Sequence, residues 1–188
     1  MKLVLEFVVS LFILVVMSST VVAMDRYVSL SGGNVSPYTS WSSAARSIQS
    51  AVDACVDGDT VVVTNGVYYP TSQVSVTKGI TIRSANGAAV TAIDGQEARR
   101  CLYVSAPNAI VDGFTIRNGY SEDDGAGVLV VSNGYVKNSV IRNNVIHYQD
   151  GGGVALQGGG TVYNCLIVSN RNDWGGSYGW GGGVCIMG

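Results

Sequence analysis

Apolar and polar residues alternate over short stretches in most of this chain, and Asn and Gly interrupt these stretches at close intervals. Examples are DTVVVTNG (59–66), VSVTKGITIRSANG (74–87) and CLYVSAPNAIVDGFTIRNG (101–119). The residues between the interruptions are mainly Val, Ile, Thr and Ser, which favour extended backbone. This pattern predicts a succession of short β-strands from about residue 60 to the end of the sequence.

One segment before the strands has helical spacing instead, and it predicts a helix over about residues 42–56. Ser40 or Ser42 is expected to cap its start, and Gly58 follows its end as a stop signal. The apolar face of this helix would consist of Ala44, Ala45, Ile48, Val52 and Cys55.

The strand region contains an internal repeat. VDGFTIRNG (111–119), VKNSVIRNN (136–144) and VYNCLIVSN (162–170) align, which places Ile116, Ile141 and Ile167 at intervals of 25 and 26 residues. The segments GAGVLV (125–130), GGGVAL (151–156) and GGGVCI (181–186) align as well. We therefore expect two short strands and the intervening turns in each repeat.

A repeat of this length without a helix favours a solenoid of stacked strands, in which equivalent residues lie above one another. The expected inward columns are Phe114–Ser139–Cys165, Ile116–Ile141–Ile167 and the Val and Leu pairs Val128/Val130, Val154/Leu156 and Val184/Ile186. Asn118 and Asn143 are expected at turns, where Asn tolerates a left-handed backbone. The alternative is a β-sandwich built from hairpins.

The segments SIQSAVDACVDGDTVVVTNGVYY (47–69), GFTIRNG (113–119) and the GGGV…NC pattern of 151–165 resemble the pectin-lyase-like class of exported bacterial proteins. Over about residues 26–188, the resemblance implies an all-β, right-handed parallel β-helix (solenoid) with an N-terminal amphipathic capping helix. The class contains lyases, glycoside hydrolases and adhesins. Its Gly-His-Gly, Arg-x-Lys and Arg-x-Pro-x-x-Arg motifs are absent here, so no catalytic residue is carried over.

The domain organisation that we expect begins with a signal peptide over residues 1–23, because FVVSLFILVVM (7–17) precedes small residues before Met24. An uncleaved anchor is the alternative. An N-terminal segment with the capping helix (24–57) and β-helix rungs (58–188) follow. The mature chain is then secreted or at the cell surface, with no membrane span. No second cap is visible, so we expect truncation, with further rungs or a partner chain at the C-terminal end.

The composition of the chain argues against two classes of function, nucleic-acid binding and zinc binding. The chain has 188 residues, a net charge of −2 and 13% charged residues, and no basic patch recurs, which argues against nucleic acid as a partner. The four cysteines contain no Cys-x-x-Cys pair, which disfavours a zinc site. They are expected as buried or half-buried thiols, although an exported location would also permit disulfides.

Candidate chemistry gathers in the segments 118–127, 143–153 and 169–183, which stacking would place on one edge of the solenoid. Aromatic faces stack on sugar rings, and carboxylates accept hydroxyl hydrogen bonds or hold Ca²⁺. The alternative is that these are ordinary polar loop residues, with the tryptophans folded over the flank. The candidate ligand-binding residues are Asp123, Asp124, His147, Tyr148, Asp150, Asp173, Trp174, Tyr178 and Trp180.

A second candidate is an outward column of Arg117 and Arg142, which could bind an anion such as the carboxylate of a uronate chain. Stacked like charges repel, so the alternative is a solvated or acid-paired face, with Asp112 as the candidate partner.

Three functions follow from these patterns. The first is an exported β-helix protein whose loop edge binds extracellular polysaccharide or a surface partner. The second is a polysaccharide lyase or glycoside hydrolase acting on uronate-type glycans. The third is a structural stalk or adhesin passenger segment.

Overall fold

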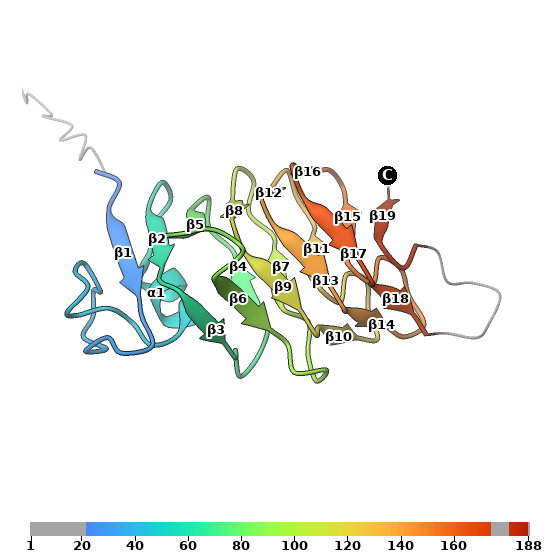
Figure 1. Ribbon diagram of the computed structural model, residues 1–188. Coiled ribbons are helices and arrows are strands. Elements are labelled where there is room, and N and C mark those ends of the chain that lie inside the picture. Colours follow the sequence, from blue (N-terminus) through green and yellow to red (C-terminus); the bar gives the residue numbers. More distant parts are fainter. Residues whose placement is uncertain (1–21, 174–180, 188) are drawn as a thin grey trace, which may run out of the picture.

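The computed structural model describes residues 22–173 and 181–187, and in it the chain winds into a parallel β-solenoid (Figure 1). Every strand pair among these residues is parallel, and strands from successive windings lie side by side. The β-sandwich alternative is therefore wrong, because hairpins would pair their strands antiparallel. The all-β class and the parallel β-helix are confirmed.

Four sheets run along the solenoid, and we call them sheets A to D. Sheet A contains β1 (Asp25–Val28), β2 (Thr60–Val63), β5 (Thr81–Ser84), β8 (Ile110–Asp112), β12 (Tyr135–Lys137) and β16 (Thr161–Tyr163). Sheet B contains β3 (Gly66–Tyr68), β6 (Thr91–Asp94), β9 (Thr115–Arg117), β13 (Val140–Arg142) and β17 (Leu166–Val168). Sheet C contains β4 (Val74–Val76), β7 (Leu102–Val104), β11 (Val128–Val130), β15 (Val154–Gln157) and β19 (Val184–Met187). Sheet D contains β10 (Tyr120–Ser121), β14 (Val145–Ile146) and β18 (Arg171–Asn172).

One rung contributes a strand to sheet C, then to sheet A, then to sheet B, and the later rungs add a short strand to sheet D. The prediction of two strands per repeat is therefore wrong. The segment 136–144 is not one strand, because Asn138 adopts a φ of 52° and turns the chain between β12 and β13. Asn tolerates this left-handed conformation at a tight corner. Asn118 and Asn143 occupy a second set of corners, as predicted, with φ of 51° and 56°.

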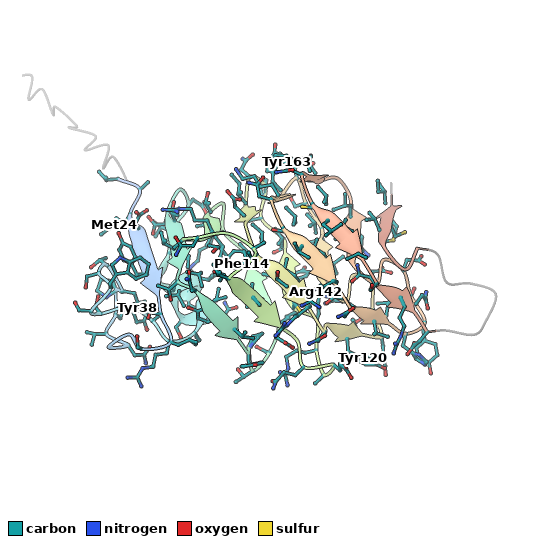
Figure 2. All side chains as sticks on the ribbon, viewed as in Figure 1. Met24, Tyr38, Phe114, Tyr120, Arg142 and Tyr163 are labelled. Atoms are coloured by element: carbon teal, nitrogen blue, oxygen red, sulfur yellow. The ribbon has the colours of Figure 1, made fainter. Side chains whose placement is uncertain are left out.

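The register of the predicted inward columns is confirmed, and the earlier rungs are buried, whereas Val184 and Ile186 on β19 are exposed. Ile116, Ile141 and Ile167 are register partners in sheet B, and the first two are fully buried. Phe114 is also fully buried in the interior (Figure 2), and its N–H donates to Ser139 Oγ of the next rung. In sheet C the register pairs are Val128 with Val154, Val130 with Leu156, Val154 with Val184 and Leu156 with Ile186. Each rung thus adds one layer to a continuous apolar core.

The capping helix is present but shorter than predicted. Helix α1 covers Ile48–Ala54, and its N-cap is Ser47, which accepts from the N–H of Ser50. The segment before it is not helical because Ala45 pairs with β1, accepting from Ser29 N–H and donating to Tyr27 O. Ala45 is nevertheless buried in the core, so its apolar character reflects strand-like rather than helical packing.

Helix α1 covers the free edge of sheet C at β4. The side chain of Gln49 accepts the N–H of Ser75 at 2.7 Å and donates to the carbonyl of Ser75 at 3.3 Å, as a neighbouring strand would. Lys78 Nζ donates to the carbonyls of Val52, Asp53 and Cys55 and so satisfies the end of the helix. The first rung is thereby protected from edge-to-edge pairing.

A buried ion pair joins β1 to β2 at this end of the molecule. Asp59, which is fully buried, accepts from Arg26 Nη2 at 3.0 Å, and its carboxylate also accepts the N–H groups of Met24 and Val56. Burial alone would raise the pKa of Asp59, but these N–H groups and the guanidinium outweigh it and hold the pKa below its usual value.

The four cysteines are free thiols, as predicted: Cys55 and Cys101 are buried, and Cys165 and Cys185 are half-buried. Most of the expected signal peptide, residues 1–21, lies outside the described residues. Within the part of the chain that the structure describes, no helix has the length and apolar character needed to cross a membrane.

Candidate functional site

Sheet D brings the three candidate loops together on one edge of the solenoid. Strands β10, β14 and β18 lie side by side, and they belong to the segments 118–127, 143–153 and 169–183. We call the described residues of these segments the loop edge. In Figure 2, Tyr120 marks this edge, whereas Tyr163 of sheet A lies at the opposite edge of the molecule. The predicted placement of the loops is confirmed.

A ladder of two asparagines, the buried Asn144 and the half-buried Asn170, supports the loop edge from inside. Asn144, which is fully buried, accepts the N–H of Gly119 at 2.7 Å and donates to Asn170 Oδ1 at 2.9 Å. Its Nδ2 also donates to Ile116 O, and Asn170 Nδ2 donates to Ile141 O. A Cβ at Gly119 would lie 2.8 Å from Asn144 Oδ1, so only glycine fits under the first asparagine.

The alignment of Gly119, Asn144 and Asn170 is visible in the sequence, but it did not reveal this ladder. The side chains satisfy backbone groups at the corner between sheets B and D, where the strand pattern changes. They therefore hold the first residues of each loop in a fixed register, which is what a binding surface built from several rungs requires.

Arg100 fastens the first loop, and sequence reasoning missed it. Its guanidinium donates to the carbonyls of Asp124 and Gly125, to Ser121 Oγ and to Gln73 Oε1. Burial lowers the pKa of Arg100, and the carboxylates of Asp123 and Asp124 oppose that effect only in part. No sequence signal identifies this role, because Arg100 stands outside the repeat and three of its five hydrogen bonds go to backbone carbonyls.

Two of the candidate acids connect neighbouring loops. Asp124 accepts the N–H of Asp150 at 2.9 Å through one carboxylate oxygen and Gln157 Nε2 at 2.6 Å through the other. The carbonyl of Asp150 in turn accepts the N–H of Gly125. Both oxygens of Asp124 are thus engaged within the protein. Asp123 differs, because its side chain is exposed and only its N–H bonds locally, to Ser121 Oγ.

A column of acid, histidine and acid runs along the exposed side of the loop edge. Glu122, His147 and Asp173 each follow a strand of sheet D, and they are spaced by 25 and 26 residues. His147 Nδ1 lies 2.5 Å from Asp173 Oδ1, and both side chains are partly exposed. A carboxylate on one imidazole nitrogen fixes the orientation and tautomer of the ring.

Two tyrosines flank this column. The Tyr148 ring packs edge-on against His147 with centroids 3.9 Å apart, and Tyr148 is 45% exposed at a φ of 80°. Tyr120, which sequence reasoning did not single out, is half-buried on β10. Partial desolvation and the nearby charges of Glu122 and Asp173 raise the pKa of Tyr120. The sequence feature that could have identified Tyr120 as a site residue is its position directly after Gly119, at the corner before sheet D.

The remaining candidates of the third loop, Trp174, Tyr178 and Trp180, lie outside the described residues, so their predicted role stays a prediction. The described part of that loop ends at Asp173 and resumes at Gly181.

The outward arginine column lies on sheet B, next to the loop edge. The prediction that Asp112 is its ion-pair partner is wrong. Arg117 and Arg142 are register partners, as predicted. Arg117 Nε donates to Asp94 Oδ2 at 2.8 Å, whereas Asp112 pairs with Lys137 on sheet A. The reason is the corner at Gly113 between β8 and β9, which places Asp112 on a different sheet from Arg117.

The loop edge combines exposed carboxylates, a carboxylate-oriented imidazole and tyrosine rings from three successive rungs. Such a surface can stack on a ring and accept hydrogen bonds from hydroxyl groups. Among residues 22–173 and 181–187, no group of three or more His, Cys, Asp or Glu side chains is arranged to hold a metal ion. The structure therefore adds no support for the Ca²⁺ expectation.

A scan against models of known protein families, a search of curated proteins and a search of solved structures each return no match to this chain.

Proposed function

We propose that this protein is an exported member of the pectin-lyase-like β-helix class that binds extracellular polysaccharide along its loop edge. The observation that carries the proposal is the convergence of Tyr120, His147 and Tyr148 with exposed acids on one edge. These residues come from successive rungs, so they form a row along the solenoid axis. A linear polymer matches such a row, because each rung can contact a different part of it.

The support beneath the row favours a binding surface over a set of unconnected loops. Arg100, the Asn144–Asn170 ladder and Asp124 together tie the loops to one another and to the core. Rigid placement lowers the entropy lost when a ligand is bound. The exposed Tyr148 and the half-buried Tyr120 supply apolar ring faces at low cost in side-chain entropy.

The test is a pull-down with insoluble cellulose, chitin, pectin gel and alginate gel. The variant Tyr148→Ala removes a ring that is 45% exposed on the loop edge. The matched control Tyr135→Ala removes one that is 37% exposed on sheet A. We expect Tyr148→Ala to weaken retention on the binding polysaccharide about tenfold, which corresponds to about 1.4 kcal/mol. Equal losses for the two variants, or no retention of the unmodified protein, would overturn the proposal.

The His147–Asp173 pair supports a second candidate function, a lyase or hydrolase acting on uronate-type glycans. An imidazole held by a carboxylate is a common arrangement for general acid–base catalysis. The assay follows unsaturated-uronate absorbance and reducing-end release on pectin and alginate, with and without added Ca²⁺. Activity that is lost in His147→Gln would support this candidate. No activity over the panel would contradict it.

A further inference from the structure

The outer face of sheet B carries two parallel columns next to the loop edge. One column is largely apolar and consists of Val67, Ala92, Thr115, Val140 and Leu166, which are successive register partners. The other column places Asp94, Arg117 and Arg142 in register on β6, β9 and β13. One carboxylate therefore stands beside two guanidinium groups, and this column carries one unbalanced positive charge.

The carboxylate in this column is already saturated by protein donors. Asp94 Oδ1 accepts the N–H of Gln96 at 3.0 Å and Asn118 Nδ2 at 3.1 Å. Asp94 Oδ2 accepts Arg117 Nε at 2.8 Å and Asn118 Nδ2 at 3.0 Å. The side chain is only 6% exposed. With four contacts from three residues, Asp94 has little capacity left to neutralise a second arginine.

The two guanidinium groups keep most of their donors available. Arg117 donates to Asp94 through Nε. Its two Nη groups have no hydrogen-bond partner among the described residues. Arg142 is half-buried, and its guanidinium forms no hydrogen bond or ion pair within the same described residues. Stacked like charges on neighbouring strands are destabilising unless an opposite charge lies between or above them.

A pocket opens where these donors and the apolar column meet. It has a volume of about 160 Å³, and its lining includes Arg117, Arg142, Thr115 and the chain segment 88–92. Thr115 Oγ1 donates to Ala88 O, which ties β9 to the segment 88–92 in the pocket lining. The pocket therefore places the cationic donors of Arg117 and Arg142 beside the apolar residues Val67 and Ala92. In Figure 2, Arg142 is labelled just above Tyr120 of the loop edge.

We propose that Arg117 and Arg142 bind an oxyanion substituent of a glycan, a carboxylate or a sulfate ester, in this pocket. The inference rests on the proposed function and specifies the chemical class of its ligand. Two oxygens of one anion can each accept from a different guanidinium, and charge-assisted bonds of this kind are among the strongest in proteins. The anion would restore charge balance to the column, while the sugar ring would contact the apolar column beside it.

The test compares three soluble polymers that share one backbone: carboxymethyl cellulose, cellulose sulfate and neutral hydroxyethyl cellulose. Arg142→Gln removes the guanidinium that has no hydrogen-bond or ion-pair partner in the described part of the chain, and so it leaves the Arg117–Asp94 pair intact. The matched control is Arg83→Gln, because Arg83 is also half-buried and projects from sheet A, away from the pocket. Affinities are measured by biolayer interferometry at constant ionic strength.

We expect at least one of the two anionic polymers to bind the unmodified protein roughly tenfold more tightly than the neutral polymer. Arg142→Gln should abolish this preference, whereas Arg83→Gln should retain it. Which of the two anionic polymers is preferred distinguishes a carboxylate from a sulfate ester. An equal loss of the preference in both arginine variants would mean that binding depends only on the net charge of the protein. That result would overturn the inference. Equal binding of all three polymers, or binding of none, would also overturn it.

A second measurement separates this inference from the proposed function, because it needs no glycan. Inorganic sulfate, compared with chloride at the same ionic strength, should raise the melting temperature of the unmodified protein and of Arg83→Gln more than that of Arg142→Gln. Equal shifts in all three proteins would count against the anion site. If neutral hydroxyethyl cellulose binds and Tyr148→Ala abolishes that binding while Arg142→Gln does not, glycan binding stands and the anion site fails.

Discussion

Asn144 Nδ2 donates to Asn170 Oδ1 at 2.9 Å across neighbouring rungs, inside the corner that precedes the loop edge. Through this contact and the bond from Gly119 N–H to Asn144 Oδ1, three rungs are linked at the point where sheet B gives way to sheet D. The position of the candidate site therefore depends on polar contacts in the interior as well as on the apolar core.

Asn144→Ala is expected to destabilise the protein by about 2–4 kcal/mol, because it removes the acceptor of the buried Gly119 N–H and the bonds from Asn144 Nδ2 to Ile116 O and Asn170 Oδ1. Equilibrium unfolding in urea measures the change. The control is Asn86→Ala, since the Asn86 side chain is exposed and bonds only to Asn65. A loss no larger than that of the control would show that the ladder does not hold the corner.

Gln49→Ala is expected to cost about 1–2 kcal/mol and to increase self-association, because it uncovers the N–H and C=O of Ser75 on the edge of β4. Urea unfolding and light scattering report the two effects. Gln149→Ala, at an exposed glutamine of the second loop, serves as the control. Unchanged stability and scattering in Gln49→Ala would contradict the capping role of α1.

The Asp59–Arg26 pair predicts a specific dependence of stability on pH. The pKa of Asp59 is lower in the folded protein than the unfolded value of about 3.9, so its contribution is complete above that value and is lost as the pH falls through the folded pKa. Asp59→Asn should reduce the free energy of unfolding by about 3 kcal/mol at neutral pH. The difference from the unmodified protein should shrink in strong acid.

The control for this experiment is Asp25→Asn, because Asp25 is exposed and lies on the neighbouring strand. It should follow the unmodified protein at every pH. A constant difference between Asp59→Asn and the unmodified protein down to the lowest pH would rule out the proposed linkage.

The cysteines should fall into two classes of reactivity. Burial raises the pKa of Cys55 to about 11 and that of Cys101 to about 12, so neither thiol forms much thiolate at mildly alkaline pH. We expect Cys165 and Cys185 to react with a disulfide reagent in the native protein, and Cys55 and Cys101 to react only after unfolding. Peptide mass spectrometry assigns the labels. Rapid labelling of Cys101 in the native state would contradict the buried placement.

The repeat interval was enough to predict the parallel solenoid, the inward Ile column and the common edge of the loops, because stacking converts sequence alignment directly into contact. Strand number and helix start were predicted less well. They depend on single residues, namely the left-handed Asn138 and the pairing of Ala45 with β1. A local pattern of apolar residues cannot distinguish a corner from a continuous strand.

For the site, alignment could have found the Glu122–His147–Asp173 column, since the three residues recur at the repeat interval. It could not have found Arg100, whose partners are mainly backbone carbonyls. It also gave the wrong acid for Arg117, because Asp112 is closer in sequence but lies beyond a corner, whereas Asp94 is the register partner on the preceding rung.

The most direct test of the account is hydrogen–deuterium exchange of the protein with and without the soluble form of the polysaccharide that retains it in the pull-down. We predict that the added protection falls on residues 118–127 and 143–153 of the loop edge and on β9 and β13 beside it. Sheet A, with the exposed Tyr135 and Tyr163, should be unchanged. Protection confined to sheet A or to the region of α1, or no protection at saturating polysaccharide, would contradict the claim that the loop edge is the binding surface.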